Sequence, residues 1–142
     1  MKLKFKRLFE DAYIPTKGTQ HASGYDLYAR ERWHILPGET VLISTGIAFE
    51  LEAGTEIQVR PRSGLSLKTK LRVANSPGTV DADFRGECCV IIENIGDESY
   101  VINKGDRIAQ AVLCPIILSE LEEVTELNTT VRGYNGFGST GV

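Results

Sequence analysis

The stretch ETVLISTGIAFE, residues 39–50, places apolar or β-branched side chains at every second position. Successive side chains of a β-strand point to opposite faces, so residues two apart share a face. That face would be formed by Val41, Ile43, Thr45, Ile47 and Phe49. The pattern predicts an extended chain with one buried side.

Short segments of the same character continue along the chain. Ile57 and Val59 alternate with polar residues, and further apolar segments occupy residues 88–93, 100–102 and 107–113. Turn-forming residues separate them, at Pro37-Gly38, Ala53-Gly54, Ser76-Pro77-Gly78, Gly96-Asp97 and Lys104-Gly105-Asp106. Many short strands at this spacing predict an all-β fold, either a sandwich, a jelly roll or a barrel.

One segment favours a helix. Residues 63–70, SGLSLKTK, would begin with Ser63 as the N-cap and turn Leu65 inward, beside Leu67 or a later apolar residue. The acidic segment 120–126 is compatible with either a strand or a helical turn.

Composition limits the class of protein. The chain has 142 residues, 42% hydrophobic and 25% charged, as in a globular protein with a single domain. A net charge of −3 argues against binding nucleic acid or an anionic membrane through bulk charge. The longest uncharged run, residues 108–119, is too short to span a bilayer, and the N-terminus does not resemble a secretory signal. An odd count of three cysteines, two of them adjacent in an apolar run, indicates buried thiols in a reducing compartment, so we expect a cytoplasmic protein.

The C-terminal residues differ from the rest. Gly133, Gly136, Gly138 and Gly141 fall within nine residues, so we expect a β domain over residues 1–130 and a flexible arm over 131–142. Residues 136–141 match G-x-G-x-x-G, but one residue follows them, which excludes a dinucleotide-binding βαβ unit. The arm is either a disordered tail or a flap that closes on a ligand. The groups suited to a ligand are the glycine amides and the side chains of Arg132, Phe137, Ser139 and Thr140.

A basic segment and an acidic segment contain further candidates. Residues 60–72 hold five of the 16 Lys and Arg residues, and Arg62-Ser63-Gly64 at a helix start suits phosphate binding; the alternative is a solvated basic face. In NSPGTVDADFRG, residues 75–86, a Pro-Gly hairpin would place Asp81 as a general base. Asp81 and Asp83 would share one face of a strand, as a metal pair or as a polar edge.

Two more segments carry isolated polar residues. ASGYDLYA, residues 22–29, places Asp26 between two tyrosines in an alternating strand. GDRIAQAVLCP, residues 105–115, interrupts an apolar strand with Gln110, whose amide needs a partner in the protein or in a ligand.

These five segments, in this order over residues 22–141, resemble the five signature motifs of the trimeric dUTPase family, the dUTP diphosphatases. The resemblance implies an all-β jelly roll or distorted β-barrel that assembles as a homotrimer. It implies hydrolysis of dUTP to dUMP and diphosphate with Mg²⁺, through attack of water on the α-phosphorus. Such an activity supplies dUMP for dTMP synthesis and keeps uracil out of DNA.

The resemblance also implies a role for each motif residue. Asp81 would orient and deprotonate the attacking water, and Asp26 would act through water on the Mg²⁺ that the triphosphate carries in. Phosphate contacts would come from Arg62, Ser63, Gly64, Gln110, Arg132, Ser139 and Thr140. Base and sugar contacts would come from Asn75, Thr79, Val80, Asp81, Phe84, Cys89 and Phe137. The arm would cover the active site of a neighbouring subunit, so that subunits share their sites.

The chain departs from the family pattern at two positions. Phe84 stands where the family usually has a tyrosine under the deoxyribose, and Asn135 replaces a glycine of the fifth motif. The ring of Phe84 can still exclude a 2′-hydroxyl, and Asn tolerates left-handed backbone better than most residues.

Two other functions remain open at this point. The first is a dCTP deaminase, an enzyme that shares the fold. Its second motif has the sequence Arg-Ser-Ser and its third carries a catalytic glutamate, whereas here the second motif is Arg-Ser-Gly and Asp81 occupies the third. The second alternative is a catalytically silent relative that binds dUTP or acts in signalling.

Overall fold

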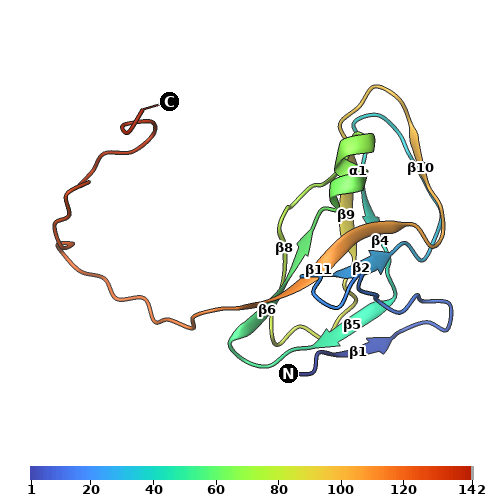
Figure 1. The fold of residues 1–142 in the computed structure, drawn as a ribbon, viewed down its shortest axis with the longest axis horizontal. Coiled ribbons are helices and arrows are strands. Elements are labelled where there is room, and N and C mark those ends of the chain that lie inside the picture. The colour runs from blue at the N-terminus through green and yellow to red at the C-terminus, as the bar shows by residue number, and fades with distance from the viewer. Residues whose placement is uncertain (142) are drawn as a thin grey trace.

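Short antiparallel strands make up the body of this computed structural model, which describes residues 1–141 (Figure 1). Four open sheets form, with the strand orders β2-β11-β6-β8, β4-β9-β7, β1-β5 and β10-β3, and no closed barrel arises within residues 1–141. The predicted all-β class with one short helix is confirmed. The elements are β1 (Lys4–Arg7), β2 (Tyr25–Tyr28), β3 (Trp33–Ile35), β4 (Thr40–Ile43), β5 (Ile47–Glu50), β6 (Thr55–Arg60), α1 (Ser63–Lys68), β7 (Leu71–Val73), β8 (Gly78–Val80), β9 (Val90–Asn94), β10 (Tyr100–Ile102) and β11 (Arg107–Pro115).

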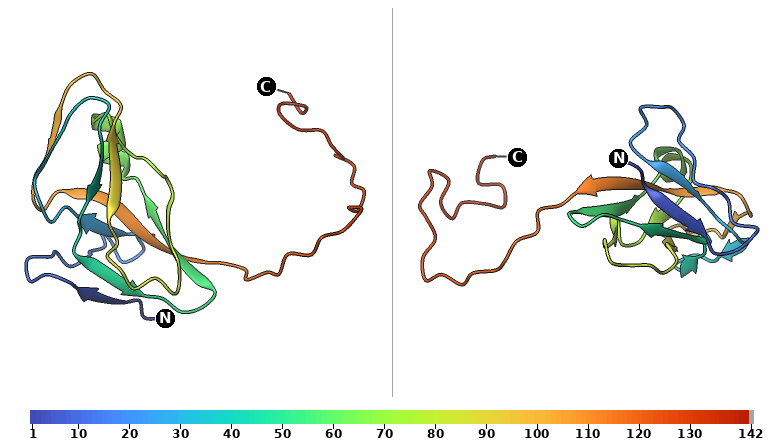
Figure 2. Two further views of the ribbon diagram at one scale, coloured as in Figure 1. Left: turned by 180° about the vertical axis from the view of Figure 1, so that it is seen from behind. Right: turned by 90° about the horizontal axis from the view of Figure 1, so that it is seen from below.

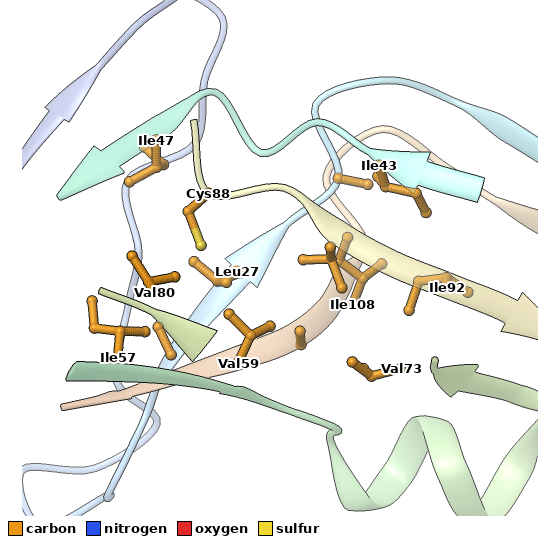
Figure 3. Close-up of a cluster of buried hydrophobic side chains, with 14 of the residues drawn as sticks. Leu27, Ile43, Ile47, Ile57, Val59, Val73, Val80, Cys88, Ile92 and Ile108 are labelled. Atoms are coloured by element: carbon orange, nitrogen blue, oxygen red, sulfur yellow. The ribbon is translucent and has the colours of Figure 1, made fainter. Parts of the chain in front are cut away.

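The core lies between the sheets and is lined mainly by aliphatic side chains (Figure 3). Leu27, Ile43, Ile57 and Ile92 are fully buried in it. The face predicted for residues 39–50 is confirmed, because all five of its residues are buried. Alternation along strands such as β4, β6 and β9 therefore supplies much of the core, as the period of two requires.

A glycine divides residues 39–50 into the two strands β4 and β5. Gly46 has φ +71°, a left-handed conformation that costs glycine nothing. A Cβ at this position would also lie 2.7 Å from the Cβ of Ala12. The turn at residues 44–46 is therefore built for glycine.

Helix α1 is shorter than predicted and starts differently. Ser63 is its first helical residue, and Arg62 occupies the N-cap position with extended backbone and no side-chain cap. The helix ends at Lys68 because Thr69 is extended and leads into β7. Leu65 packs against the core, as predicted. Leu67 is 85% exposed, so of the two alternatives for the residue beside Leu65, Leu67 is excluded.

The predicted hairpin around Pro77 is absent from the described chain. β7 pairs with β9 and β8 pairs with β6, so residues 74–77 pass from one sheet to another. Asp81 and Asp83 follow the end of β8 and lie outside the strands, so the prediction that they share a strand face was wrong. A turn sequence indicates a reversal of direction, but it does not tell which strand the chain pairs with next.

Beyond β11 the chain leaves the body (Figure 2). The amide of Ile116 donates to the carbonyl of Gly54 at 2.9 Å, and residues 117–141 form no strand or helix. The segment 120–126, for which the sequence allowed a strand or a helical turn, thus forms neither. Val142, the last residue of the expected arm, lies outside the described residues. Within residues 1–141 the structure contains no helix that is both long enough and apolar enough to span a membrane.

Candidate active site

Asp26 on β2 is the centre of a charged cluster at one edge of the four-stranded sheet. Its side chain is 16% exposed, and both carboxylate oxygens face arginines. Oδ1 accepts a hydrogen bond from Nε of Arg62 at 2.9 Å, and Oδ2 lies 3.5 Å from Nη1 of Arg107. Two guanidinium groups around one carboxylate leave a net positive charge, which suits an anionic ligand.

Gln110 on β11 supports the same cluster from the neighbouring strand. Gln110 lies opposite Asp26 in the strand register, and its Nε2 donates to the carbonyl of Pro61 at 3.0 Å. Gly24 provides the space, since a Cβ there would lie 2.6 Å from Oε1 of Gln110. The partner that the sequence required for Gln110 is thus a backbone carbonyl of this protein, directly before Arg62.

Ser63 and Gly64 lie exposed in the first turn of α1, next to Arg62. The first amides of a helix have no partner within the helix, and here Ser66 is the first residue to donate back, to the carbonyl of Arg62 at 3.1 Å. Their N–H groups can therefore turn toward an anion, as the sequence suggested.

Arg107 was missed in the sequence analysis. Its side chain is 51% exposed and, together with Arg62, lines a hollow of about 400 Å³ between α1, β10 and β11. The sequence showed only that Arg107 begins the apolar segment that carries Gln110; its pairing with Tyr28, close to Asp26, is seen in the folded chain.

A second group of predicted residues lines a cleft of about 270 Å³ beside β8. Phe84 is 44% exposed, and its ring lies over Gly86, where a Cβ would come within 2.6 Å of it. The cleft brings together five of the residues predicted to contact base and sugar: Asn75, Thr79, Val80, Phe84 and Cys89. Its lining also includes Gly78 and five residues that sequence reasoning did not select: Leu42, Val59, Glu87, Cys88 and Ile91. Asp81 follows Val80 and is exposed.

The two cysteines at this cleft are not poised as nucleophiles. Burial, aided by the neighbouring charge of Glu87, raises the pKa of the Cys88 thiol to about 12 and that of the Cys89 thiol to about 11. Both thiols are therefore protonated near neutral pH. All three cysteines are free thiols, as predicted, but only Cys88 is buried, whereas Cys89 and Cys114 are half-buried.

Within one chain, the cluster around Asp26 and the cleft beside β8 lie far apart. Asp26 lies on one edge strand of the sheet and Thr79 on the other, three strand spacings or roughly 14 Å away. Along the strands they are offset as well, because Gln110 pairs with Arg60 whereas Val80 pairs with Ile57. The third group, on residues 132–140, is carried away from the body by the extended arm (Figure 1).

The cluster around Asp26 can contribute to a Mg²⁺ site but cannot form one alone. No group of three or more His, Cys, Asp or Glu side chains in residues 1–141 is arranged to hold a metal ion. Mg²⁺ is commonly bound by one or two carboxylates together with substrate phosphates and water. A single carboxylate beside two arginines that suit a phosphate fits that arrangement.

Comparison with known proteins identifies the family. The architecture and the two clusters are those of an all-β protein that binds a phosphorylated ligand, and the dUTPase family model matches residues 10–141. The chain is 52% identical to the deoxyuridine 5'-triphosphate nucleotidohydrolase of Nautilia profundicola over 141 residues, 99% of either chain. This protein therefore belongs to the dUTPase family.

Solved structures agree in fold. A variant of the dUTPase of Staphylococcus bacteriophage 80alpha with dUpNHpp superposes with a TM-score of 0.94 at 31% identity, covering 99% of both chains. A variant of the dUTPase of phage phi11 of S. aureus, whose structure reveals the coordination of a structural Mg(II) ion, gives 0.83 at 28% identity and covers 89% of this chain and 98% of the other. The fold is thus the all-β jelly roll of these enzymes.

Proposed function

We propose that this protein hydrolyses dUTP to dUMP and diphosphate in the presence of Mg²⁺, with water attacking the α-phosphorus. The observation that carries the proposal is the cleft beside β8, which gathers five of the expected base and sugar residues in a member of the dUTPase family. In a cell the reaction would supply dUMP for dTMP synthesis and keep dUTP away from DNA.

The cleft beside β8 would bind the nucleoside. Asn75, Thr79, Val80 and the main chain of Cys89 would recognise the uracil edge, and Phe84 would lie under the deoxyribose. Cytosine presents the opposite hydrogen-bond pattern, so buried backbone groups that suit uracil would be left unpaired by it. Discrimination between the two bases follows from that difference.

The cationic groups would bind the triphosphate and the transition state. Arg62, Ser63, Gly64 and Gln110 would contact the phosphates from the body of one subunit. Asp81, which is exposed and directly follows Val80 of the base cleft, would take a proton from the attacking water. The arm would add Arg132, Ser139 and Thr140 at the outer phosphate and stack Phe137 on the base. Charge neutralisation of this kind is the main requirement of phosphoryl transfer.

Asp26 would hold Mg²⁺ through a water molecule, and the remaining ligands would be phosphate oxygens. A divalent ion bound there would offset the negative charge of the phosphates. In the free protein Asp26 is paired with Arg62, so the Mg²⁺ that arrives with the triphosphate must compete with Arg62 for that carboxylate.

The proposal includes a homotrimer with shared active sites. The separation of the two clusters within one chain and the projection of the arm away from its own body both support it (Figure 2). The arm, residues 131–142, would then cover an active site formed by the body, residues 1–130, of a neighbouring subunit. Stable nucleic-acid or membrane partners are not part of the proposal, and three free thiols favour a reducing compartment such as the cytoplasm.

One incubation with Mg²⁺ separates the candidate functions. We expect diphosphate and dUMP to appear from dUTP, with no ammonia released from dCTP. Ammonia from dCTP would instead identify a deaminase, and calorimetric binding of dUTP without diphosphate release would identify a silent relative. Either of these results would overturn the proposal.

A further inference from the structure

One wall of the base cleft is formed by chain that belongs to no sheet. Residues 81–89 have no strand structure, yet Glu87, Cys88 and Cys89 line the cleft. A strand is held in place by its ladder of hydrogen bonds, whereas a segment of this kind needs other contacts to stay in position.

Those contacts come from the turn at residues 44–46, between β4 and β5. The amide of Gly46 donates to Oε1 of Glu87 at 2.7 Å, and the hydroxyl of Ser44 donates to the same oxygen. Oγ1 of Thr45 donates to the carbonyl of Cys88 at 2.6 Å. The amide of Cys88 donates in turn to the carbonyl of Ile47 at 2.7 Å.

The turn is itself held from its other side. Nε of Arg30 donates to Oγ of Ser44 at 3.0 Å, and the backbone amide of Arg30 donates to the carbonyl of Ser44 at 2.9 Å. The Arg30 side chain is 17% exposed and lies over the ring of Phe9 at 4.0 Å. Glu87 thus connects the cleft wall to a turn that is itself fixed in the body.

We propose that Glu87 is a positioning residue for base recognition, whose carboxylate holds the main chain of Cys88 and Cys89 at the correct place in the cleft. The inference rests on the proposed function, because it assumes that this cleft binds uracil. Glu87 acts through the backbone of its neighbours, since Oε1 already accepts from both Ser44 and Gly46. What matters is the acceptor oxygen and its place, so an uncharged acceptor of the same shape should replace it.

The test compares Glu87→Ala with Glu87→Gln, using Glu52→Ala as the control for loss of an exposed carboxylate. Affinity is measured by calorimetry for a non-hydrolysable imido analogue of dUTP and, separately, for inorganic triphosphate, which has no base. Leaving the buried amide of Gly46 without an acceptor should weaken binding of the analogue in Glu87→Ala by about tenfold. Binding of triphosphate should not change, and Glu87→Gln should behave like the wild type.

Ser44→Ala provides a second test in case Glu87→Ala does not fold. It removes one of the two donors to the same oxygen, so we expect a smaller loss of affinity, again confined to the analogue. Three results would each overturn the inference: unchanged affinity in both variants, equal weakening of the analogue and of triphosphate, or Glu87→Gln as weak as Glu87→Ala. Failure of the wild type to hydrolyse dUTP would contradict the proposed function instead, so the two failures are distinguishable.

Discussion

Asp81 and Asp83 are both exposed carboxylates directly after β8. Neither lines the base cleft, and each is next to a residue that does, Val80 and Phe84 respectively. The family resemblance assigned the general base to Asp81, and a general base must lie within hydrogen-bond reach of the proton that it removes. Substituting each carboxylate in turn therefore tests that assignment.

Asp81→Asn should bind the non-hydrolysable dUTP analogue normally but turn over dUTP some 10²–10⁴-fold more slowly, the usual contribution of a positioned general base. Asp83→Asn is the matched control and should retain activity. The measurements are diphosphate release and calorimetric affinity. Turnover of Asp81→Asn close to that of the wild type would mean that another group activates the water.

Arg62→Ala should raise the Kd of the dUTP analogue by about 10–150-fold, because a charge-assisted contact contributes about 1.5–3 kcal/mol. The Kd of dUMP should change much less, since it lacks the outer phosphates. Lys68→Ala, an exposed cation at the other end of α1, serves as the control. Equal weakening of both ligands would place Arg62 away from the outer phosphates.

Helix α1 carries Ser63 and Gly64, two of the residues proposed to contact phosphate, and it is only six residues long. So short a helix is not stable by itself in water, and its position must come from tertiary contacts. Nη1 of Arg72 supplies several of these, donating to the carbonyls of Ser66 at 3.2 Å, Thr69 at 3.0 Å and Leu71 at 2.8 Å. Positive charge at the C-terminal end of a helix also complements its dipole.

Arg72→Ala should therefore lower the free energy of unfolding by about 1–2 kcal/mol, since the helix loses hydrogen bonds to a charged group. Urea denaturation measures the change, and Arg32→Ala, the loss of an exposed arginine, provides the comparison. If the two variants unfold at the same urea concentration, α1 is held by other contacts.

At the scale of the whole molecule, the proposed site is divided among three parts that one chain does not bring together. The Asp26 cluster and the base cleft lie at opposite edges of one sheet, and the arm points away from both (Figure 1). A cyclic trimer would unite them by taking each part from a different copy.

Mixing of inactive subunits tests this arrangement. Asp81→Ala and Arg132→Ala should each be nearly inactive, but unfolding them together and reassembling them should restore roughly one site in four if Asp81 and Arg132 of a site come from different subunits. Subunit exchange is verified independently, for example with differently tagged chains. A mixture no more active than its separate components would show that each site is built within one chain.

The amino-acid sequence by itself determined the fold class, the buried face of residues 39–50 and the family. Periodicity and turn residues are local properties, so the chain displays them before it folds. The residues gathered at the base cleft were also accessible in this way, because most of them are neighbours within residues 75–89.

Tertiary structure decided what depends on pairing between distant segments. Only the folded chain shows that β7 and β8 belong to different sheets, that Arg107 shares Asp26 with Arg62, and that Glu87 is tied to the turn at residues 44–46. Asp26 and Arg62 are 36 residues apart, and Ser44 and Glu87 are 43 apart. No local pattern encodes such contacts, because they arise from the register in which strands pair and sheets pack.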